Sequence, residues 1–358
     1  ERCARSCATA KATLAPSMVD GEDARLACVP WKIATVSLSA ALVDSMPYAS
    51  LFSSAAARMA IMELKSDRAE RSSLIRARRP IAMPVPYSFA RTCSAFSLIV
   101  HPDIRRMLMT VKVFQEGARA LAYWSGVTVD IIRKHPDAEA RQKAEDLLVV
   151  EEHRIAFYFS DMGFISTNLC LQCLGGHGYI VDSGMEQFVR DARITQIYEG
   201  ANGIQALDLV GRKLPAHKGR AIQLMFGIVQ GFCEKYADNA ALSPFVKPLA
   251  DALERLVTAT RWLMQHAVSN PDNGGAASMD YLYLVALVAL GYQWAQVARI
   301  CKNKLSNPDD DSFDRAFYQN KVVCAQFFME KILPETMAYL AKVQAGSDAL
   351  MSLPAEAF

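Results

Sequence analysis

Several motifs that mark common enzyme classes are missing from this 358-residue chain. It has no G-x-S-x-G turn, no H-E-x-x-H pair and no G-x-G-x-x-G loop after a strand. These absences argue against a serine hydrolase, a zincin and a Rossmann-type dinucleotide-binding protein. Its net charge of +2 is too small to create a strong electrostatic field that would attract nucleic acid. The longest apolar run, residues 281–292, is too short to cross a bilayer and predicts a buried helix, so we expect no membrane span.

Paired cysteines are also lacking. The nine cysteines have an odd count and irregular spacing, which favours free thiols in a reducing compartment over a disulfide framework. The N-terminus shows no apolar stretch of the kind that forms a signal peptide. We therefore expect a soluble, cytoplasmic protein, or a mitochondrial matrix protein if the source is eukaryotic.

Residues 1–100 have few of the residues that form turns. They contain one of the 18 glycines and no Asn, Gln or His, but they hold 14 serines and ten arginines. A β-domain needs glycine and asparagine for its turns, and only residues 50–70 approach a helical period. The arginines between Arg68 and Arg79 could form an anion-binding patch. The composition favours instead an atypical segment over 1–98, poorly ordered or read in a wrong frame.

From about residue 99 onward the pattern is helical. Pro102 begins a stretch to residue 135 whose apolar residues recur at spacings of three and four, as on one face of a long helix. The charged stretch 135–146 is expected to bridge to a second helix over 147–174, with a left-handed glycine cap after it. A short amphipathic helix is expected over 184–194, and another after Gly200.

Beyond Pro215 four further stretches each have a helical apolar stripe and are expected to form a second helical bundle. Turn-rich loops at 269–278 and 306–311 are expected to separate them. The chain is therefore predicted to be all-α, with one helical domain at 99–215 and a second at 216–358.

Two candidates for chemistry lie near residue 175. Cys170 and Cys173 form a lone C-x-x-C, which without a second pair predicts a buried helix face rather than a zinc site, so we expect no metal. His177, in a G-G-H-G turn, has no partner motif. It could act as a ligand or base, shape the backbone, or face a phosphate, and these roles stay open.

Glu199 is a single carboxylate between Tyr198 and Gly200, just before a predicted helix. An apolar pocket raises the pKa of a carboxyl group, and a value near 6–7, roughly, suits a general base at neutral pH. Gly200 and Gly203 would let a flat ligand approach the backbone. The alternative is a glutamate that only complements the dipole of the helix, and the residues alone favour it.

Two motifs and the spacing between them resemble the acyl-CoA dehydrogenase family. The stretch LQCLGGHGYI is followed by MEQFVRDARITQIYEGANGIQALDLVGRKL, which joins a Q-x-x-G-G turn to I-Y-E-G through an R-D-A-R-I helix. Together they are similar to the C-terminal helical domain of these flavin-dependent enzymes. The ending DALMSLPAEAF resembles the subgroup with an extra C-terminal helical domain, which includes 3-methylmercaptopropionyl-CoA dehydrogenase-like enzymes. The resemblance covers residues 99–358 and does not extend to 1–98.

The resemblance implies FAD-dependent α,β-dehydrogenation of an acyl-CoA thioester to a trans-2-enoyl-CoA, as in fatty acid β-oxidation. Glu199 would be the catalytic base that removes the α-proton. The backbone N–H of Glu199 and a ribityl hydroxyl of the flavin would hold the thioester oxygen as negative charge develops on it. Tyr198 and Gly200 would line the acyl pocket.

The same resemblance implies cofactor contacts and partners. Gln172, Gly175 and Gly176 would meet the adenine dinucleotide part of FAD from a neighbouring subunit, which implies a homo-oligomer, a dimer or a tetramer. Gly203 and Ala201 would lie beside the flavin. Ala201 replaces the family's usual threonine, so a hydrogen bond worth about 0.5–1.5 kcal/mol is expected to be lost. Electron-transfer flavoprotein is the implied acceptor.

The family's N-terminal helical domain, its middle β-domain and its R-x-x-F-G stretch are not recognisable here. We therefore expect a truncated copy that, alone, binds flavin weakly or not at all. Two alternatives stay open: an acyl-CoA oxidase of the same fold, and a non-catalytic helical assembly module that has lost its cofactor.

Overall fold

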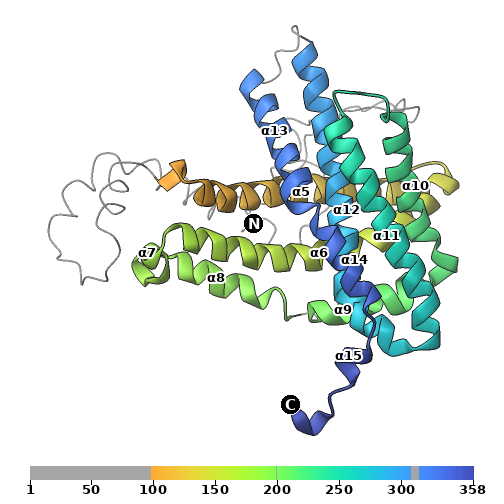
Figure 1. Ribbon diagram of the computed structural model, residues 1–358. Helices are drawn as coiled ribbons and strands as arrows, with labels where there is room; N and C mark the ends of the chain where they lie inside the picture. The colour runs from red at the N-terminus through yellow and green to blue at the C-terminus, as the bar shows by residue number, and fades with distance from the viewer. Residues whose placement is uncertain (1–97, 199, 308–313) are drawn as a thin grey trace, which may run out of the picture.

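The computed structural model describes residues 98–198, 200–307 and 314–358, and for residues 150–157 the backbone alone (Figure 1). Within these ranges every regular element is a helix, which confirms the all-α prediction. Of the predicted atypical segment, only Leu98 is described, in the short 3-10 helix η2 (Leu98–Val100). The arginine cluster near residue 70 lies outside the described residues.

Two long helices, α5 (Pro102–Lys134) and α6 (Ala138–Cys173), pack along one another. The predicted start of α5 at Pro102 is confirmed, and Val111, Ala118 and Leu121 of its predicted apolar face are buried. The prediction of a bridge over 135–146 is wrong, because α6 already begins at Ala138. Asp137 caps this helix by accepting a hydrogen bond from the backbone N–H of Glu139 at 3.0 Å.

The chain reverses after α6 through α7 (Gly176–Tyr179) and η3 (Val181–Ser183). Helix α8 (Met185–Ile194) then packs against α6, which confirms the predicted short helix. Gly175 follows α6 with φ of 59° and ψ of −142°. The positive φ agrees with the predicted glycine cap, but the ψ value does not belong to the left-handed helical region that we expected.

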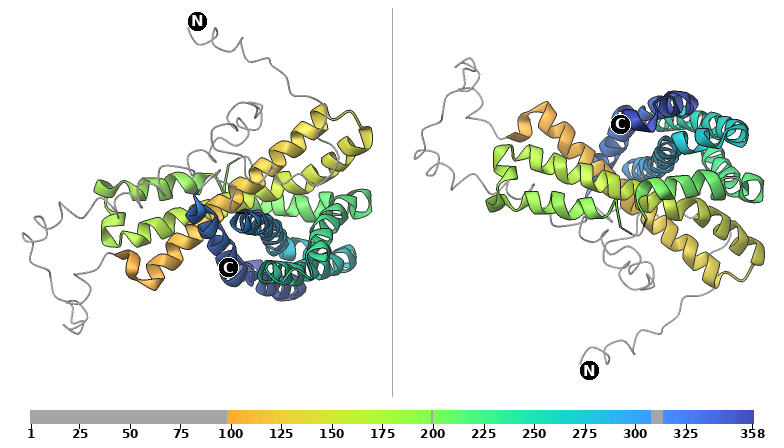
Figure 2. Two further views of the ribbon diagram at one scale, coloured as in Figure 1. Left: turned by 90° about the horizontal axis from the view of Figure 1, so that it is seen from above. Right: turned by 90° about the horizontal axis from the view of Figure 1, so that it is seen from below.

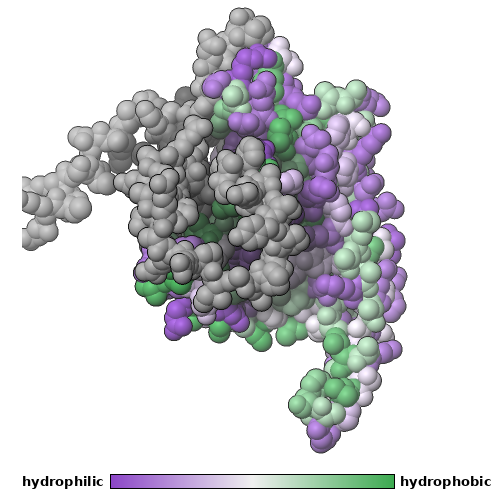
Figure 3. Space-filling model, turned by 60° about the vertical axis from the view of Figure 1, so that its left-hand side comes forward, coloured by the Kyte–Doolittle hydropathy of each residue, from purple (hydrophilic) through white to green (hydrophobic). Residues whose placement is uncertain are grey.

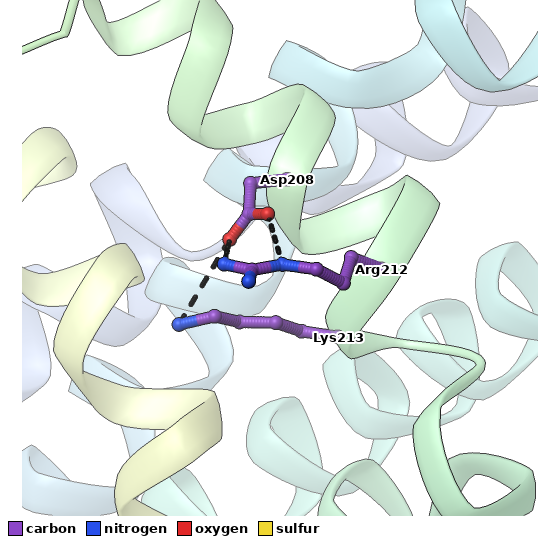
Figure 4. A network of polar contacts seen from close by, with 3 residues as sticks. All are labelled: Asp208, Arg212 and Lys213. Atoms are coloured by element: carbon purple, nitrogen blue, oxygen red, sulfur yellow. Dashed lines mark hydrogen bonds and ion pairs between the residues drawn. The ribbon is translucent and has the colours of Figure 1, made fainter.

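Helix α9 (Asn202–Asp208) begins two residues after Gly200, as predicted, and continues into the π-helical turn η4 (Leu209–Lys213). Asp208 accepts hydrogen bonds from Nε and Nη2 of Arg212 at 2.6 and 2.9 Å, and Nζ of Lys213 lies 4.0 Å from the same carboxylate (Figure 4). Because Arg212 is exposed, solvent screens this pair, and the pair adds little stability to a turn whose Leu209 and Val210 are buried.

The C-terminal helices gather on one side of α5 and α6 (Figure 2). The predicted loop over 269–278 is wrong, because Asn270 caps a helix that begins at Pro271, where a missing N–H is tolerated. The predicted loop over 306–311 lies mostly outside the described residues. The elements are η5 (Ala216–Gly219), α10 (Arg220–Lys235), α11 (Ser243–Ser269), α12 (Pro271–Ser306), α13 (Arg315–Phe327), η6 (Phe328–Ile332), α14 (Glu335–Gln344), α15 (Asp348–Met351) and η7 (Ala355–Ala357).

Helix α12 forms the centre of the hydrophobic core. It contacts α5, α6, α9, α11, α13 and α14, and it buries Tyr281, Leu284, Leu287 and Trp294 almost completely. It is long and apolar enough to cross a membrane, but 67% of its most apolar 18-residue stretch is buried in the fold, as in the core helix of a globular protein.

One continuous core extends from Val113 in α5 to Val343 in α14. It therefore passes without interruption across the predicted domain boundary at residue 215, and that boundary stays a prediction. The C-terminal tail projects below this body and carries exposed apolar side chains, among them Leu350, Met351 and Phe358 (Figure 3).

Candidate functional site

The predicted site residues fall into two groups at opposite ends of α8. Gln172, Gly175 and Gly176 lie where α6 ends and α7 begins, and all three are exposed. The second group belongs to the turn between α8 and α9 and the first residues of α9: Tyr198, Gly200, Ala201 and Gly203. Helix α8, whose ten residues make it about 15 Å long, lies between the two groups. Glu199, the predicted base, lies outside the described residues.

The backbone is open at three of the predicted glycines. A Cβ at Gly175, Gly176 or Gly203 would meet no atom of the described residues within 4 Å. Gly200 differs, because a Cβ there would lie 2.9 Å from Nε2 of Gln205. Its φ of 97°, like the φ of 59° at Gly175, is a conformation that other residues rarely adopt. A ligand can therefore approach the backbone at both ends of α8.

The G-G-H-G turn is closed against the end of α6 at Gly178. This glycine is buried, and a Cβ there would lie 2.4 Å from the carbonyl oxygen of Leu171. His177, its neighbour, is exposed on α7. Close packing against α6 thus explains the glycine at position 178, while the roles considered for His177 stay open.

A buried carboxylate, Asp161 on α6, fixes the turn that carries the second group. Its Oδ1 accepts hydrogen bonds from Nε2 of Gln196 and Nδ2 of Asn202, each at 2.6 Å. Asn202 also pairs with the hydroxyl of Ser160, and its backbone N–H donates to the carbonyl oxygen of Gln196 at 3.3 Å. The two ends of the 196–202 turn are therefore tied to each other and to α6.

The second oxygen of Asp161 accepts a hydrogen bond from the hydroxyl of Tyr283 on α12, at 2.5 Å. Burial, the hydrogen bond to Asp161 and the charge of that carboxylate raise the pKa of Tyr283 far above its usual value. The phenol therefore stays protonated and can donate. Three neutral donors from three parts of the chain thus surround one buried carboxylate.

Sequence reasoning missed this cluster. Ser160 and Asp161 interrupt the apolar stretch FYFSDMGF, and a polar pair in such a stretch is the one signal that could have marked a buried site. Nothing local in the sequence links that pair to Tyr283, which is 122 residues away.

Cys170 and Cys173 are both buried on α6, and Cys170 packs with Val111 and Met185. Burial raises the pKa of the Cys170 thiol to about 11. The five cysteines of the described residues form no disulfide, and within those residues no group of three metal-ligating side chains occurs. Cys170 and Cys173 therefore belong to the buried, apolar face of α6.

A hollow of about 370 Å³ lies between α9, the start of α12 and α15. Leu207, Pro271 and Met351 are among the residues that line it. None of the predicted site residues does, so this hollow is separate from both ends of α8.

Two family descriptions match the chain. The C-terminal domain of acyl-CoA dehydrogenase matches residues 58–214, and a domain described as acetyl-CoA dehydrogenase C-terminal like matches residues 225–354. The first match includes residues 58–98, where the sequence alone suggested no resemblance.

Individual proteins agree with these matches. Butyryl-CoA dehydrogenase of Syntrophomonas wolfei is 29% identical over 265 residues, which are 73% of this chain and 43% of that protein. 3-Methylmercaptopropionyl-CoA dehydrogenase of Ruegeria pomeroyi is 31% identical over 261 residues, 72% of this chain and 43% of that protein. The chain thus spans less than half the length of these relatives.

The fold agrees as well. An acyl-CoA dehydrogenase of Bacillus anthracis, solved in complex with FAD, superposes with a TM-score of 0.57 at 14% identity, over 84% of this chain and 48% of that one. The fold, the two family matches and the relatives all point the same way. The chain belongs to the acyl-CoA dehydrogenase family and carries its C-terminal helical domains.

Proposed function

We propose that this chain supplies the catalytic base and part of the FAD site of an enzyme that converts an acyl-CoA thioester into the trans-2-enoyl-CoA. The observation that carries the proposal is the turn around Glu199. Gln196 and Asn202 are tied to Asp161 on either side of it, and Gly200 has a positive φ. A base that removes a proton from carbon needs a defined position, because proton transfer depends on geometry.

In the proposed reaction Glu199 accepts the proton of the α-carbon. The backbone N–H of the same residue donates to the thioester oxygen, a contact that strengthens as negative charge develops there. FAD, when bound, accepts the hydride that leaves the β-carbon. Tyr198 and Gly200 border the acyl chain beside the base.

The residues present fit FAD at the two ends of α8. The open backbone at Gly175 and Gly176, with Gln172 exposed beside it, suits an extended ligand, and so does the backbone at Gly203. Ala201 offers no hydroxyl to the ring. The family resemblance assigns the first end to the FAD of a neighbouring subunit, so the proposal includes a homo-oligomer.

The relatives described above are named as dehydrogenases. The family resemblance implies electron-transfer flavoprotein as the acceptor, and the proposal includes it. Peroxide formation on exposure of the reduced protein to oxygen would favour the oxidase reaction instead.

The test is an anaerobic titration of the purified chain in excess FAD with butyryl-, octanoyl- and methylthiopropionyl-CoA. Because the chain alone is expected to bind flavin weakly, FAD is supplied in excess to load the site. Bleaching of the visible flavin band is then the expected result, and Glu199→Gln is expected to abolish it. Glu254→Gln is the matched control, because it removes one carboxylate from the exposed face of α11. Equal bleaching in Glu199→Gln would contradict the assignment of the base.

A second readout does not need turnover of the flavin. Removal of the α-proton by Glu199 would exchange it with solvent, so deuterium from heavy water should enter the α-carbon of butyryl-CoA. Nuclear magnetic resonance of the recovered thioester measures this exchange. Exchange that continues in Glu199→Gln would show that another group takes the proton.

A further inference from the structure

We infer that Tyr283, on α12 of the C-terminal helical extension, is a positioning residue that holds the 196–202 turn through Asp161. The inference deepens the proposed function and rests on it only for the assignment of Glu199 as the base. It gives the extension a role at the site, since Tyr283 belongs to the part of the chain that matches the second family domain, residues 225–354.

Asp161 lies between the turn and α12. One of its oxygens accepts from both Gln196 and Asn202, which stand three residues before and three after Glu199. The other oxygen accepts from Tyr283. A carboxylate held on one side has fewer ways to rotate, so the phenol fixes the orientation in which both turn residues find their acceptor.

Tyr283 is itself held by two aromatic neighbours. Its ring lies edge-on to Tyr158 of α6 with centroids 5.4 Å apart, and it stacks on Tyr339 of α14 with centroids 5.3 Å apart. Edge-on and stacked pairs of this spacing restrain a ring beyond simple burial. Two helices of the extension, α12 and α14, therefore contribute to the direction in which the hydroxyl points.

A second tyrosine of α12 allows a positioning role to be distinguished from ordinary stability. Tyr281, on the same helix, is completely buried, and its hydroxyl lies 2.8 Å from Oγ1 of Thr260 on α11. Tyr281→Phe and Tyr283→Phe each remove one phenolic hydroxyl from α12. Only the second removes a partner of Asp161, so a local effect on the turn distinguishes them.

The experiment is hydrogen–deuterium exchange of the full chain, followed by mass spectrometry of peptides that cover 195–205. Loss of a hydrogen bond to a charged group is expected to speed exchange of this turn roughly tenfold in Tyr283→Phe. In Tyr281→Phe the same peptides should change by less than about twofold, once exchange is normalised to peptides of α11. Equal acceleration of the turn in both variants would overturn the inference.

Conservative rescue gives a second arm. Asp161→Asn keeps an oxygen that can accept from Gln196 and Asn202, whereas Asp161→Leu keeps none. We expect the turn to exchange near the wild-type rate in Asp161→Asn and much faster in Asp161→Leu. Equal exchange in the two variants would show that Asp161 acts only through packing.

The titration with acyl-CoA and FAD supplies the last arm. Tyr283→Phe should lower the rate of bleaching while the acyl-CoA concentration at half-maximal rate stays the same, and Tyr281→Phe should change neither. If Glu199→Gln loses bleaching but Tyr283→Phe leaves the exchange of the turn unaltered, the assignment of Glu199 as the base stands and the positioning role of Tyr283 is refuted. Altered exchange in Tyr283→Phe with full activity in Glu199→Gln would refute the base alone.

Discussion

Replacement of Gly178 by alanine tests the geometry of the turn between α6 and α7. A Cβ at this position would lie 2.4 Å from the carbonyl oxygen of Leu171 and 3.1 Å from the Cβ of Leu174. The first approach is about 1 Å closer than ordinary van der Waals contact, and the oxygen belongs to the backbone, so the last turn of α6 has to shift. We expect Gly178→Ala to lower the free energy of unfolding by about 1–3 kcal/mol.

Gly176→Ala is the matched control on the same short helix. Among the residues that the structure describes, its Cβ would meet no atom within 4 Å, and the backbone there does not have a positive φ. Alanine is expected to stabilise this position by about 0.4–1 kcal/mol, because it lowers the entropy of the unfolded chain. Both variants share that gain, so the difference between them isolates the clash.

Urea denaturation, followed by far-ultraviolet circular dichroism, measures both free energies of unfolding. The two midpoints should move in opposite directions with little change in slope. A Gly178→Ala variant as stable as Gly176→Ala would refute the close packing of this turn against α6. It would also remove the reason given for the glycine in the G-G-H-G motif.

Three further outcomes are expected, each measured by urea denaturation. Gly200→Ala should lower the free energy of unfolding by about 1–3 kcal/mol, because alanine is strained at a φ of 97°, and an unchanged midpoint would contradict that backbone. Asp137→Ala should lower it by about 1 kcal/mol through loss of the cap of α6, whereas no loss would support the predicted bridge. Burial raises the pKa of Cys170, Cys233 and Cys324 from 9.0 to about 11, so the unfolded state releases these protons first. Stability should therefore fall between pH 9 and 11, by about 1 kcal/mol per thiol at pH 10, and a flat profile would refute this burial.

The long helices could be predicted because their signals are local. Pro102 and the apolar residues after it mark the start and the buried face of α5. The helix predicted over 184–194 likewise agrees with the bounds of α8. The spacing of three and four depends only on the helix itself. Tertiary contacts were not needed to predict these elements.

Two predicted connections were wrong because polar composition concealed helix starts. Asp137 and Asn270 are caps, so the charged and polar residues after them are already helical. Gly274 suggested a turn, yet it is buried in α12, where its Cβ position lies 3.3 Å from the Cβ of Ala267 and 3.6 Å from Cγ1 of Val210. At this position the absence of a side chain lets neighbouring helices pack closely, and no local pattern in the sequence reveals that contact.

The candidate site likewise has one part that could be predicted from the sequence and one part that could not. Glycines 175, 176, 200 and 203 stand out in the sequence, and the structure gives them open or left-handed backbone. The residues that tie the turn in place could not be predicted. Asp161 meets Asn202 and Tyr283 only because α6, α9 and α12 pack together, and their sequence separations of 41 and 122 residues carry no periodic signal.

Anaerobic titration of the chain and excess FAD with acyl-CoA tests the central claim most directly. The account predicts that acyl-CoA bleaches the flavin with the wild-type chain and with Glu254→Gln, and that Glu199→Gln abolishes the bleaching. Bleaching that is the same in Glu199→Gln and in the wild type would contradict Glu199 as the base. Bound FAD that no acyl-CoA reduces in the wild type would contradict dehydrogenation by this chain.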